Sequence, residues 1–329
     1  MPHPFRPPPE WAPHEAVWIG FPGDPEEWPV GLAEAQRNVA AFADAVHAGG
    51  AGERVELIAR TEGDAETASK LVGSGVTVSV VPFGDIWLRD TGPIIVANGS
   101  ARRARGFGFN GWGGKYVMAG DEAVAETLAG RAGLPLDRND WILEGGAIDG
   151  DGTGLAATTA QCLGNPNRNP GALRADIERW LASDLGIDRL LWLGQGLEND
   201  HTDGHVDNLA RFVAPGVLAL PEPAGSGDPN AQVYAAAAAR ARAFGLDIAP
   251  LPSPGRFEQD GAVVPASYMN FYIGNAAVAV PTYGRPNDAA AVRAIGDLFP
   301  DREAAGIDAR GIIRGGGSFH CCSQQLPAL

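Results

Sequence analysis

Hydrophobic positions along the chain follow two patterns, one typical of amphipathic helices and one typical of short strands. Leu32–His47 carries apolar residues three and four positions apart, which predicts a helix. Ala16–Phe21 and Arg54–Ala59 are short apolar runs that predict strands. The same criteria predict further strands over Val76–Val81, Pro93–Ala97, Arg189–Leu193, His205–Val213, Val217–Leu220, Asp247–Leu251, Asn270–Ile273 and Ala277–Pro281, and further helices over Asp64–Val72, Asp121–Ala132, Ala172–Ser183, Ala231–Phe244 and Asn287–Phe299.

The predicted helices recur at intervals of about 60 residues, with clusters of strands between them. Ala147–Thr158 reads as a hairpin that turns at Asp-Gly-Asp-Gly. This is not the single βαβαβ alternation of a doubly wound sheet. The pattern indicates an α/β chain of repeated units, each with a few strands and one helix. Because no linker or composition break interrupts it, we expect one domain over residues 1–329.

The net charge of the chain disfavours some classes of binding partner. Asp and Glu number 40 against 25 Lys and Arg, a formal net charge of −15. Such a surface disfavours nucleic-acid phosphates and anionic membranes, and fits a small cationic ligand better. No apolar run approaches the length of a membrane span, and the proline-rich N-terminus does not resemble a signal peptide. With three cysteines, too few for a disulfide framework, these features predict a cytoplasmic protein.

Three motifs match known binding signatures only in part. Gly106–Gly111 fits G-x-G-x-x-G, but the Trp-Gly-Gly that follows is a poor start for the helix that a dinucleotide site needs. Asp149–Gly154 resembles the start of a calcium loop, but position twelve is Ala160 instead of Glu. His320–Cys322 offers too few ligands for zinc. We therefore expect neither a metal nor a nucleotide cofactor.

Four segments combine reactive side chains with glycine. They are Asp85–Pro93, Leu143–Gly146, Asn199–Asn208 and Gly315–Cys322. In the third, His205 and Asp207 are two residues apart on an expected strand, which would place an imidazole beside a carboxylate on one face. The alternative is an ordinary polar strand face, and the pattern alone leaves both open.

The fourth segment places thiols after three glycines, in a turn that can expose a nucleophile to a ligand. On a strand, Cys321 and Cys322 would point to opposite sides, so at most one of them is expected to be catalytic. The alternative is a small buried cysteine, which is the usual fate of a free thiol. We assign Cys162 to that structural class.

A thiol, a histidine and several carboxylates are the parts of a cysteine hydrolase. Hydrolysis of an amide would be hindered by surplus carboxylates, because its tetrahedral intermediate is an anion. The surplus suits a substrate that is itself a cation. A guanidinium is planar, always charged and able to bind two carboxylates at once, and it would lower the pKa of a neighbouring thiol.

Spaced motifs along nearly the whole chain resemble the agmatine deiminase family, which is grouped with bacterial peptidylarginine deiminases. The similarity runs in order from residue 9 to residue 327. The motifs are Pro9–His14, Trp87–Pro93, Phe109–Gly114, Leu143–Gly146, Asn165–Pro170, Thr202–Asn208, Asn270–Ile273 and Gly315–Cys321 with Gln324 and Gln325.

The resemblance implies the pentein fold, an α/β propeller of five ββαβ-type units around a pseudo-fivefold axis. It implies hydrolysis of a guanidino group to a ureido group with release of ammonia, without a metal or organic cofactor. In this family Cys321 would be the nucleophile, His205 the general acid and base, and Asp90 and Asp207 the carboxylates that hold the guanidinium. The resemblance assigns Cys322 no role, and it places Trp87 and Glu144 in the substrate pocket.

One position departs from the family pattern. Where the family often has an acidic residue, this chain has His201, so Asp200 or Asp203 would have to compensate if that acid binds the distal amine of agmatine. Conversion of agmatine to N-carbamoylputrescine in putrescine biosynthesis is the leading hypothesis. Free arginine, peptidyl arginine and other guanidino compounds stay open as substrates. An amidinotransferase, a polyamine binder without activity and a thiol hydrolase of amides are the other classes, and a homo-oligomer is left open.

Overall fold

The computed structural model describes residues 4–329 and contains four consecutive units with the same order of elements. In each unit an antiparallel strand pair is followed by a helix and by a third strand that lies parallel to the second. The units are β4 (Ile94–Ala97), β5 (Arg102–Gly108), α5 (Val124–Arg131), β6 (Leu136–Ile142); β7 (Asp149–Gly150), β8 (Leu155–Thr158), α6 (Arg174–Leu185), β9 (Arg189–Trp192); β10 (Arg211–Ala214), β11 (Val217–Glu222), α7 (Ala231–Phe244), β12 (Asp247–Pro252); and β15 (Tyr272–Ile273), β16 (Ala277–Thr282), α8 (Asp288–Leu298), β17 (Glu303–Asp308).

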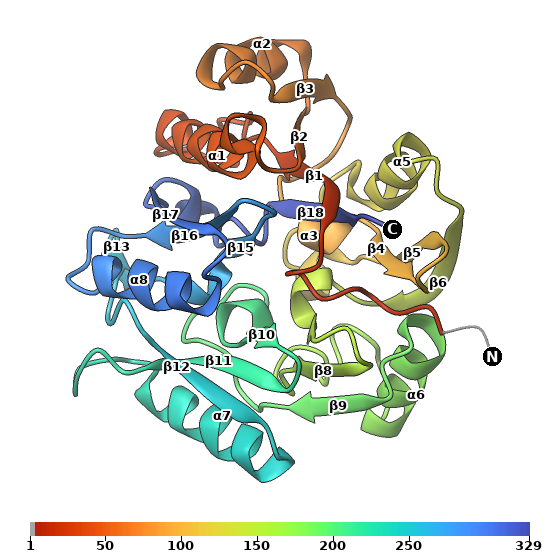
Figure 1. Ribbon diagram of the computed structural model, residues 1–329, viewed down its shortest axis with the longest axis vertical. Coiled ribbons are helices and arrows are strands. Elements are labelled where there is room, and N and C mark those ends of the chain that lie inside the picture. The colour runs from red at the N-terminus through yellow and green to blue at the C-terminus, as the bar shows by residue number, and fades with distance from the viewer. Residues whose placement is uncertain (1–3) are drawn as a thin grey trace.

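A fifth unit is assembled from both ends of the described chain. β1 (His14–Gly20), α1 (Leu32–His47) and β2 (Arg54–Ala59) supply its helix and parallel strands, and α2 (Glu62–Leu71) with β3 (Thr77–Val80) extend the sheet. The antiparallel partner of β1 is β18 (Ser323–Pro327), which pairs Trp18 with Gln324. Figure 1 shows the five units around the middle of the molecule, with the long helices at its periphery. This is the predicted pentein arrangement of ββαβ units. A small hairpin, β13 (Glu258–Gln259) with β14 (Ala262–Val263), precedes the last unit.

The core of the fifth unit supports the turn that carries the C-terminal cysteines. α1 buries Ala35, Val39, Phe42 and Val46, spaced three and four residues apart as in an amphipathic helix. Phe42 stacks on Phe319, which lies just before Cys321, with ring centroids 4.8 Å apart. Burial of such an aromatic ring contributes roughly 1.5–3 kcal/mol. This contact therefore anchors the turn to α1.

Three expectations about local structure were wrong. His205 lies in no strand, because the chain forms a 3₁₀ turn, η4 (Val206–Asn208), and β10 begins only at Arg211. The backbone N–H of His205 is taken by the hydroxyl of Thr202, and that of Leu209 by the carbonyl of Val206, so these hydrogen bonds are local. Asn270 likewise ends a 3₁₀ turn, η5 (Tyr268–Asn270). Cys321 and Cys322 lie in a turn before β18, so strand alternation does not describe them.

Among residues 4–329, no helix combines the length and apolarity needed to cross a bilayer.

Candidate active site

Short turns lead into the first strand of every unit, and the candidate site residues lie on these turns. α3 (Leu88–Thr91) carries Asp90 before β4, and Glu144 immediately precedes η3 (Gly145–Ala147) before β7. η4 carries Asp207 before β10, Asn270 ends η5 before β15, and Cys321 precedes β18. These five residues are 51 to 63 positions apart in the sequence. The repeated unit therefore brings one reactive side chain from each turn to one place.

A cavity of about 430 Å³ opens above this place. Cys321 and Asp90 line its floor. Its remaining lining includes the aromatic side chains of Trp28, Trp87, Trp112 and Tyr116, and the charged or polar side chains of Asp24, Glu26, Glu27, Asp85, His201 and Arg314. The cavity thus combines an apolar wall with a carboxylate-rich rim.

The thiol of Cys321 is held by two partners. Asn270 donates from Nδ2 to Sγ at 3.0 Å, and Oδ2 of Asp207 lies 3.5 Å from the same sulfur. Burial, together with the negative charges of Asp207 and Asp90, raises the pKa of Cys321 well above its ordinary value. In the free protein this thiol is therefore neutral, and a bound cation would favour the thiolate.

The two carboxylates beside the thiol are both fixed in orientation. Asp90 accepts from the backbone N–H of Gly146 at Oδ1 and from Nε1 of Trp112 at Oδ2, each at 2.9 Å. Asp207 accepts from Nδ1 of His320 at Oδ2, 2.8 Å away. Burial would raise the pKa of Asp207, but its contact with His320 outweighs burial and lowers it. Oδ1 of Asp207 is buried without a hydrogen-bond partner among the described residues, so it is free to accept from a ligand.

Gly146 lies where the catalytic candidates converge. A Cβ added to this glycine would lie 2.5 Å from Nδ1 of His205, 3.0 Å from Oδ1 of Asp90 and 3.1 Å from Oδ2 of Asp207. Only a residue without a side chain therefore leaves this arrangement undisturbed.

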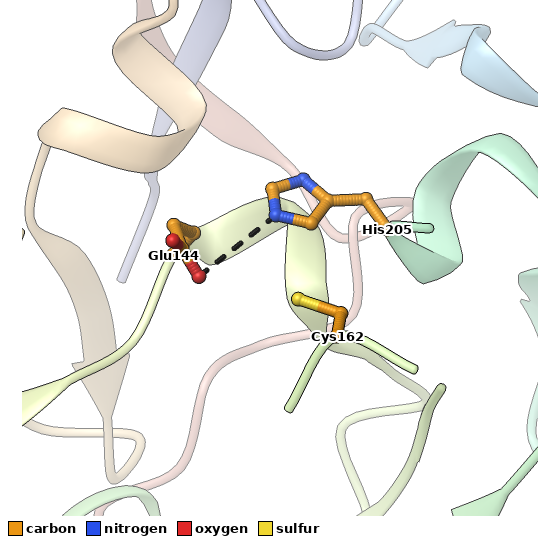
Figure 2. A group of neighbouring side chains, drawn as sticks. All are labelled: Glu144, Cys162 and His205. Atoms are coloured by element: carbon orange, nitrogen blue, oxygen red, sulfur yellow. Dashed lines mark ion pairs between the residues drawn. The ribbon is translucent and has the colours of Figure 1, made fainter. Parts of the chain in front are cut away.

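His205 is fully buried, with its two ring nitrogens in different surroundings. Nδ1 lies 3.7 Å from Oδ1 of Asp90, and Nε2 lies 3.9 Å from Oε2 of Glu144 (Figure 2). Burial disfavours the charged ring, but the charge of Asp90 and the side chains of Cys162 and Glu144 outweigh it and hold the pKa of His205 well above its ordinary value. At neutral pH the ring is an imidazolium that can donate a proton toward Asp90.

A buried ionic network that we did not predict from sequence supports Asp207 from behind. Nε2 of His320 lies 2.8 Å from Oε2 of Glu10, and Arg211 donates to the same oxygen at 2.7 Å. His320 thus bridges two carboxylates, Asp207 and Glu10. Glu10 and His320 both lie in segments that resemble the family, Pro9–His14 and Gly315–Cys321, but neither segment carries information about a contact between them.

The predicted site residues form three groups according to their position relative to the cavity. The first group lies at the cavity itself. Cys321, Asp90, Trp87 and His201 line the cavity, and His205 and Asp207 lie beside its inner end.

Glu144 belongs to the second group, because it lies behind His205 instead of lining the cavity. Its Oε1 accepts from Nε of Arg168 at 2.8 Å.

Asp200 and Asp203 form the third group, which holds the loop before η4. Asp200 accepts from the backbone of Thr202 and from Asn208, and Asp203 pairs with Lys115 at 2.8 Å. Neither lines the cavity. Cys322 also points elsewhere, with Sγ 3.5 Å from the carbonyl of Phe319.

Comparison with known proteins identifies the family of the chain. The chain matches the Porphyromonas-type peptidyl-arginine deiminase family over residues 6–327, and it belongs to that family. It is 36% identical to an agmatine deiminase of Pseudomonas putida, over 98% of this chain and 96% of that relative. The structure of the agmatine deiminase of Enterococcus faecalis superposes with a TM-score of 0.91 at 30% identity, covering 98% of this chain and 96% of that one. An agmatine deiminase variant of C. jejuni with substrate bound gives a TM-score of 0.91 at 29% identity, covering 99% and 97%.

Proposed function

We propose that this protein is a hydrolase of C–N bonds that converts the guanidino group of agmatine to a ureido group and releases ammonia. The observation that carries the proposal is the position of Asp90 and Asp207 beside the thiol of Cys321 at the inner end of the cavity. A guanidinium presents planar N–H donors that match two carboxylates. Its carbon would then face the sulfur. The product of agmatine would be N-carbamoylputrescine, an intermediate in putrescine formation.

Substrate binding creates the nucleophile in this mechanism. Asp207 and Asp90 keep the free thiol neutral, and a guanidinium between them cancels much of that negative field. The thiol of Cys321 then loses its proton to solvent, and the thiolate attacks the guanidinium carbon. The N–H of Asn270 that points at Sγ stabilises the charged sulfur before the attack.

Proton transfer through His205 completes both halves of the reaction. The imidazolium donates a proton to the departing amino nitrogen, and the C–N bond breaks to release ammonia. A cationic amidino group remains on Cys321 and is held by Asp90 and Asp207. The neutral His205 next takes a proton from water, the hydroxide adds to the amidino carbon, and collapse expels the Cys321 thiolate with the ureido product.

The rim of the cavity favours an amine over a carboxylate at the far end of the substrate. Four carboxylates line it, and two of them, Asp24 and Glu27, pair with Arg60. Asp85 and Glu26 have no cationic partner among the described residues, although Asp85 accepts from the backbone of Ile86 and from Nε1 of Trp87. Arg314 pairs with an aspartate outside the cavity. An ammonium is attracted to this rim, whereas the α-carboxylate of arginine is repelled, and the aromatic wall suits an alkyl chain. The names of the relatives support the same choice of agmatine.

A panel of guanidino compounds read by ammonia release tests the proposal, with Cys321→Ala as the control for background release. We expect agmatine to give the highest kcat/KM and free arginine a value on the order of a hundredfold lower. A higher value with arginine or with a blocked arginine peptide would overturn the substrate. Absence of ammonia release from every guanidino compound would overturn the chemistry.

A further inference from the structure

Behind the catalytic imidazole lies a second group of reactive side chains that the proposed mechanism leaves partly unused. Glu144, Cys162 and His205 come from three separate segments, and all three are fully buried. One oxygen, the sulfur and one nitrogen lie within 4.8 Å of one another. Figure 2 shows the three side chains pointing toward a common centre.

The oxygen and the nitrogen of this group lack a hydrogen bond within residues 4–329. Neither Oε2 of Glu144 nor Nε2 of His205 has a hydrogen-bond partner among the described residues, although both are buried. Their separation of 3.9 Å is too long for a hydrogen bond. Two ligands on one tetrahedral zinc ion are roughly 3.3–3.5 Å apart. The nitrogen and the oxygen would therefore have to approach by about half an ångström, and the sulfur, which lies within 4.8 Å of both, by up to about 1.5 Å. Buried polar atoms without partners are costly, and an ion would satisfy both.

We propose that Glu144, Cys162 and His205 form a site for a thiophilic divalent cation such as Zn²⁺ or Cd²⁺, and that occupation of this site inhibits the enzyme. A sulfur, a nitrogen and a carboxylate oxygen are the donor set that zinc and cadmium prefer, whereas Mg²⁺ and Ca²⁺ require oxygen ligands. A water molecule would be the fourth ligand.

Binding is coupled to proton release. Cys162 must lose its thiol proton, and His205 must lose the proton on Nε2, before each can bind the ion. Burial raises the pKa of Cys162, so protons compete with the ion and affinity increases with pH. No redox partner is needed, because the ion replaces two protons that pass to solvent.

Inhibition follows from the identity of the nitrogen ligand. An imidazole whose Nε2 is bound to a metal cannot become the imidazolium that donates to the leaving amine. Arg168, which holds the other oxygen of Glu144, repels a cation and keeps this site weaker than a dedicated structural zinc site. Because His205 and Asp90 separate the cluster from the cavity, we expect slow onset of inhibition.

Cadmium binding can be measured without turnover. The Cys321→Ser protein, which lacks the cavity thiol, is titrated with Cd²⁺ and followed by thiolate-to-metal absorption in the ultraviolet. We expect saturation at about one ion per chain. We expect no absorption in the double variant that also carries Cys162→Ala. The matched control, which carries Cys322→Ala in addition to Cys321→Ser, should keep the absorption. Absence of the absorption, or its persistence without Cys162, overturns the proposal. Glu144→Gln, a second variant, is expected to weaken binding at least tenfold.

Activity provides the second measurement. Zn²⁺ added to the unmodified enzyme is expected to inhibit ammonia release slowly, and a chelator is expected to restore it. In Cys162→Ala, or Cys162→Ser if the alanine variant does not fold, half-inhibition should need at least tenfold more Zn²⁺. Inhibition that is unchanged in both variants places the ion at Cys321 and overturns the proposal. Because cadmium binding does not depend on the reaction, failure of the proposed function would leave that measurement intact.

Discussion

Asn270 and Cys321 are joined through both the side chain and the backbone of the cysteine. Asn270 donates from Nδ2 to Sγ at 3.0 Å and accepts the backbone N–H of Cys321 at Oδ1, 3.2 Å away. One amide therefore fixes the position of the sulfur and supplies the positive end of a dipole to it. The sequence motif that contains Asn270 did not indicate this role, because Asn270 and Cys321 are 51 residues apart.

Replacing this amide by a carboxylate, Asn270→Asp, should keep the acceptor for the backbone and remove the donor to sulfur. The added negative charge disfavours the thiolate, so kcat/KM should fall about a hundredfold and the pH optimum should rise. The measurement is the pH profile of ammonia release. Asn98→Asp, in the exposed turn between β4 and β5, is the control. An unchanged profile would show that Asn270 does not act on the thiol.

Gly146→Ala should abolish activity by placing a methyl group among three side chains that we propose to be catalytic. The new Cβ would lie within 3.1 Å of His205, Asp90 and Asp207 atoms. We expect at least a thousandfold loss of kcat, because geometry at the reacting groups is disturbed directly. Gly150→Ala is the matched control, since its Cβ would meet nothing closer than 3.4 Å. Circular dichroism checks that both variants fold, and full activity of a folded Gly146→Ala would contradict the site.

Trp112→Phe removes the indole donor to Asp90 and leaves most of the aromatic wall. Burial already raises the pKa of Asp90, and loss of a hydrogen bond to the carboxylate should raise it further. The acidic limb of the kcat/KM profile should therefore move to higher pH, with about a tenfold loss near neutrality. Trp141→Phe loses a comparable bond to Asp184 far from the site and should leave the profile in place. Identical profiles for the two variants would argue against a role for the Trp112 bond.

Asp85 should make stability depend on pH near neutrality. Burial raises the pKa of Asp85 to about 7, whereas an unfolded aspartate titrates near ~3.9. The folded state therefore binds the proton more tightly. The stabilisation is complete below pH ~4 and is lost as pH rises through about 7. The midpoint temperature of thermal unfolding should decline from pH 5 to pH 8. In Asp85→Asn this decline should be smaller, whatever pH-independent change in stability the substitution itself causes.

The exposed Asp301→Asn substitution is the control for Asp85. An equal slope in all three proteins would show that Asp85 does not titrate in this range. The same ionisation strengthens the negative field at the rim, so the KM for agmatine should fall as pH rises through 7 in the unmodified enzyme.

Long periodic segments could be predicted from the sequence, because their pattern is local. α7 has the bounds that its alanine-rich run predicts, and α1 those of its apolar stripe. β5, β6 and β17 were missed because charged residues or glycines interrupt their apolar pattern. β18 was missed for a different reason: its pairing with β1 joins opposite ends of the chain.

The site was only partly predictable, because several of its contacts join residues that are far apart in the sequence. His205 and Asp207 were singled out from a strand pattern that does not exist, since local hydrogen bonds form a 3₁₀ turn there. Cys162, which was assigned a structural role, lies beside the imidazole of His205. Glu10 and His320 could not be connected, because 310 residues separate them.

The account depends most on Cys321 as the residue that carries the amidino group. Enzyme turning over agmatine is quenched with acid, digested and analysed by mass spectrometry, while ammonia release is followed in Cys321→Ala. The account predicts an amidino adduct on the peptide that contains Cys321, located at that residue by fragmentation, and loss of ammonia release in the variant. An adduct on Cys322 or Cys162, or ammonia release near the unmodified rate without Cys321, would contradict it.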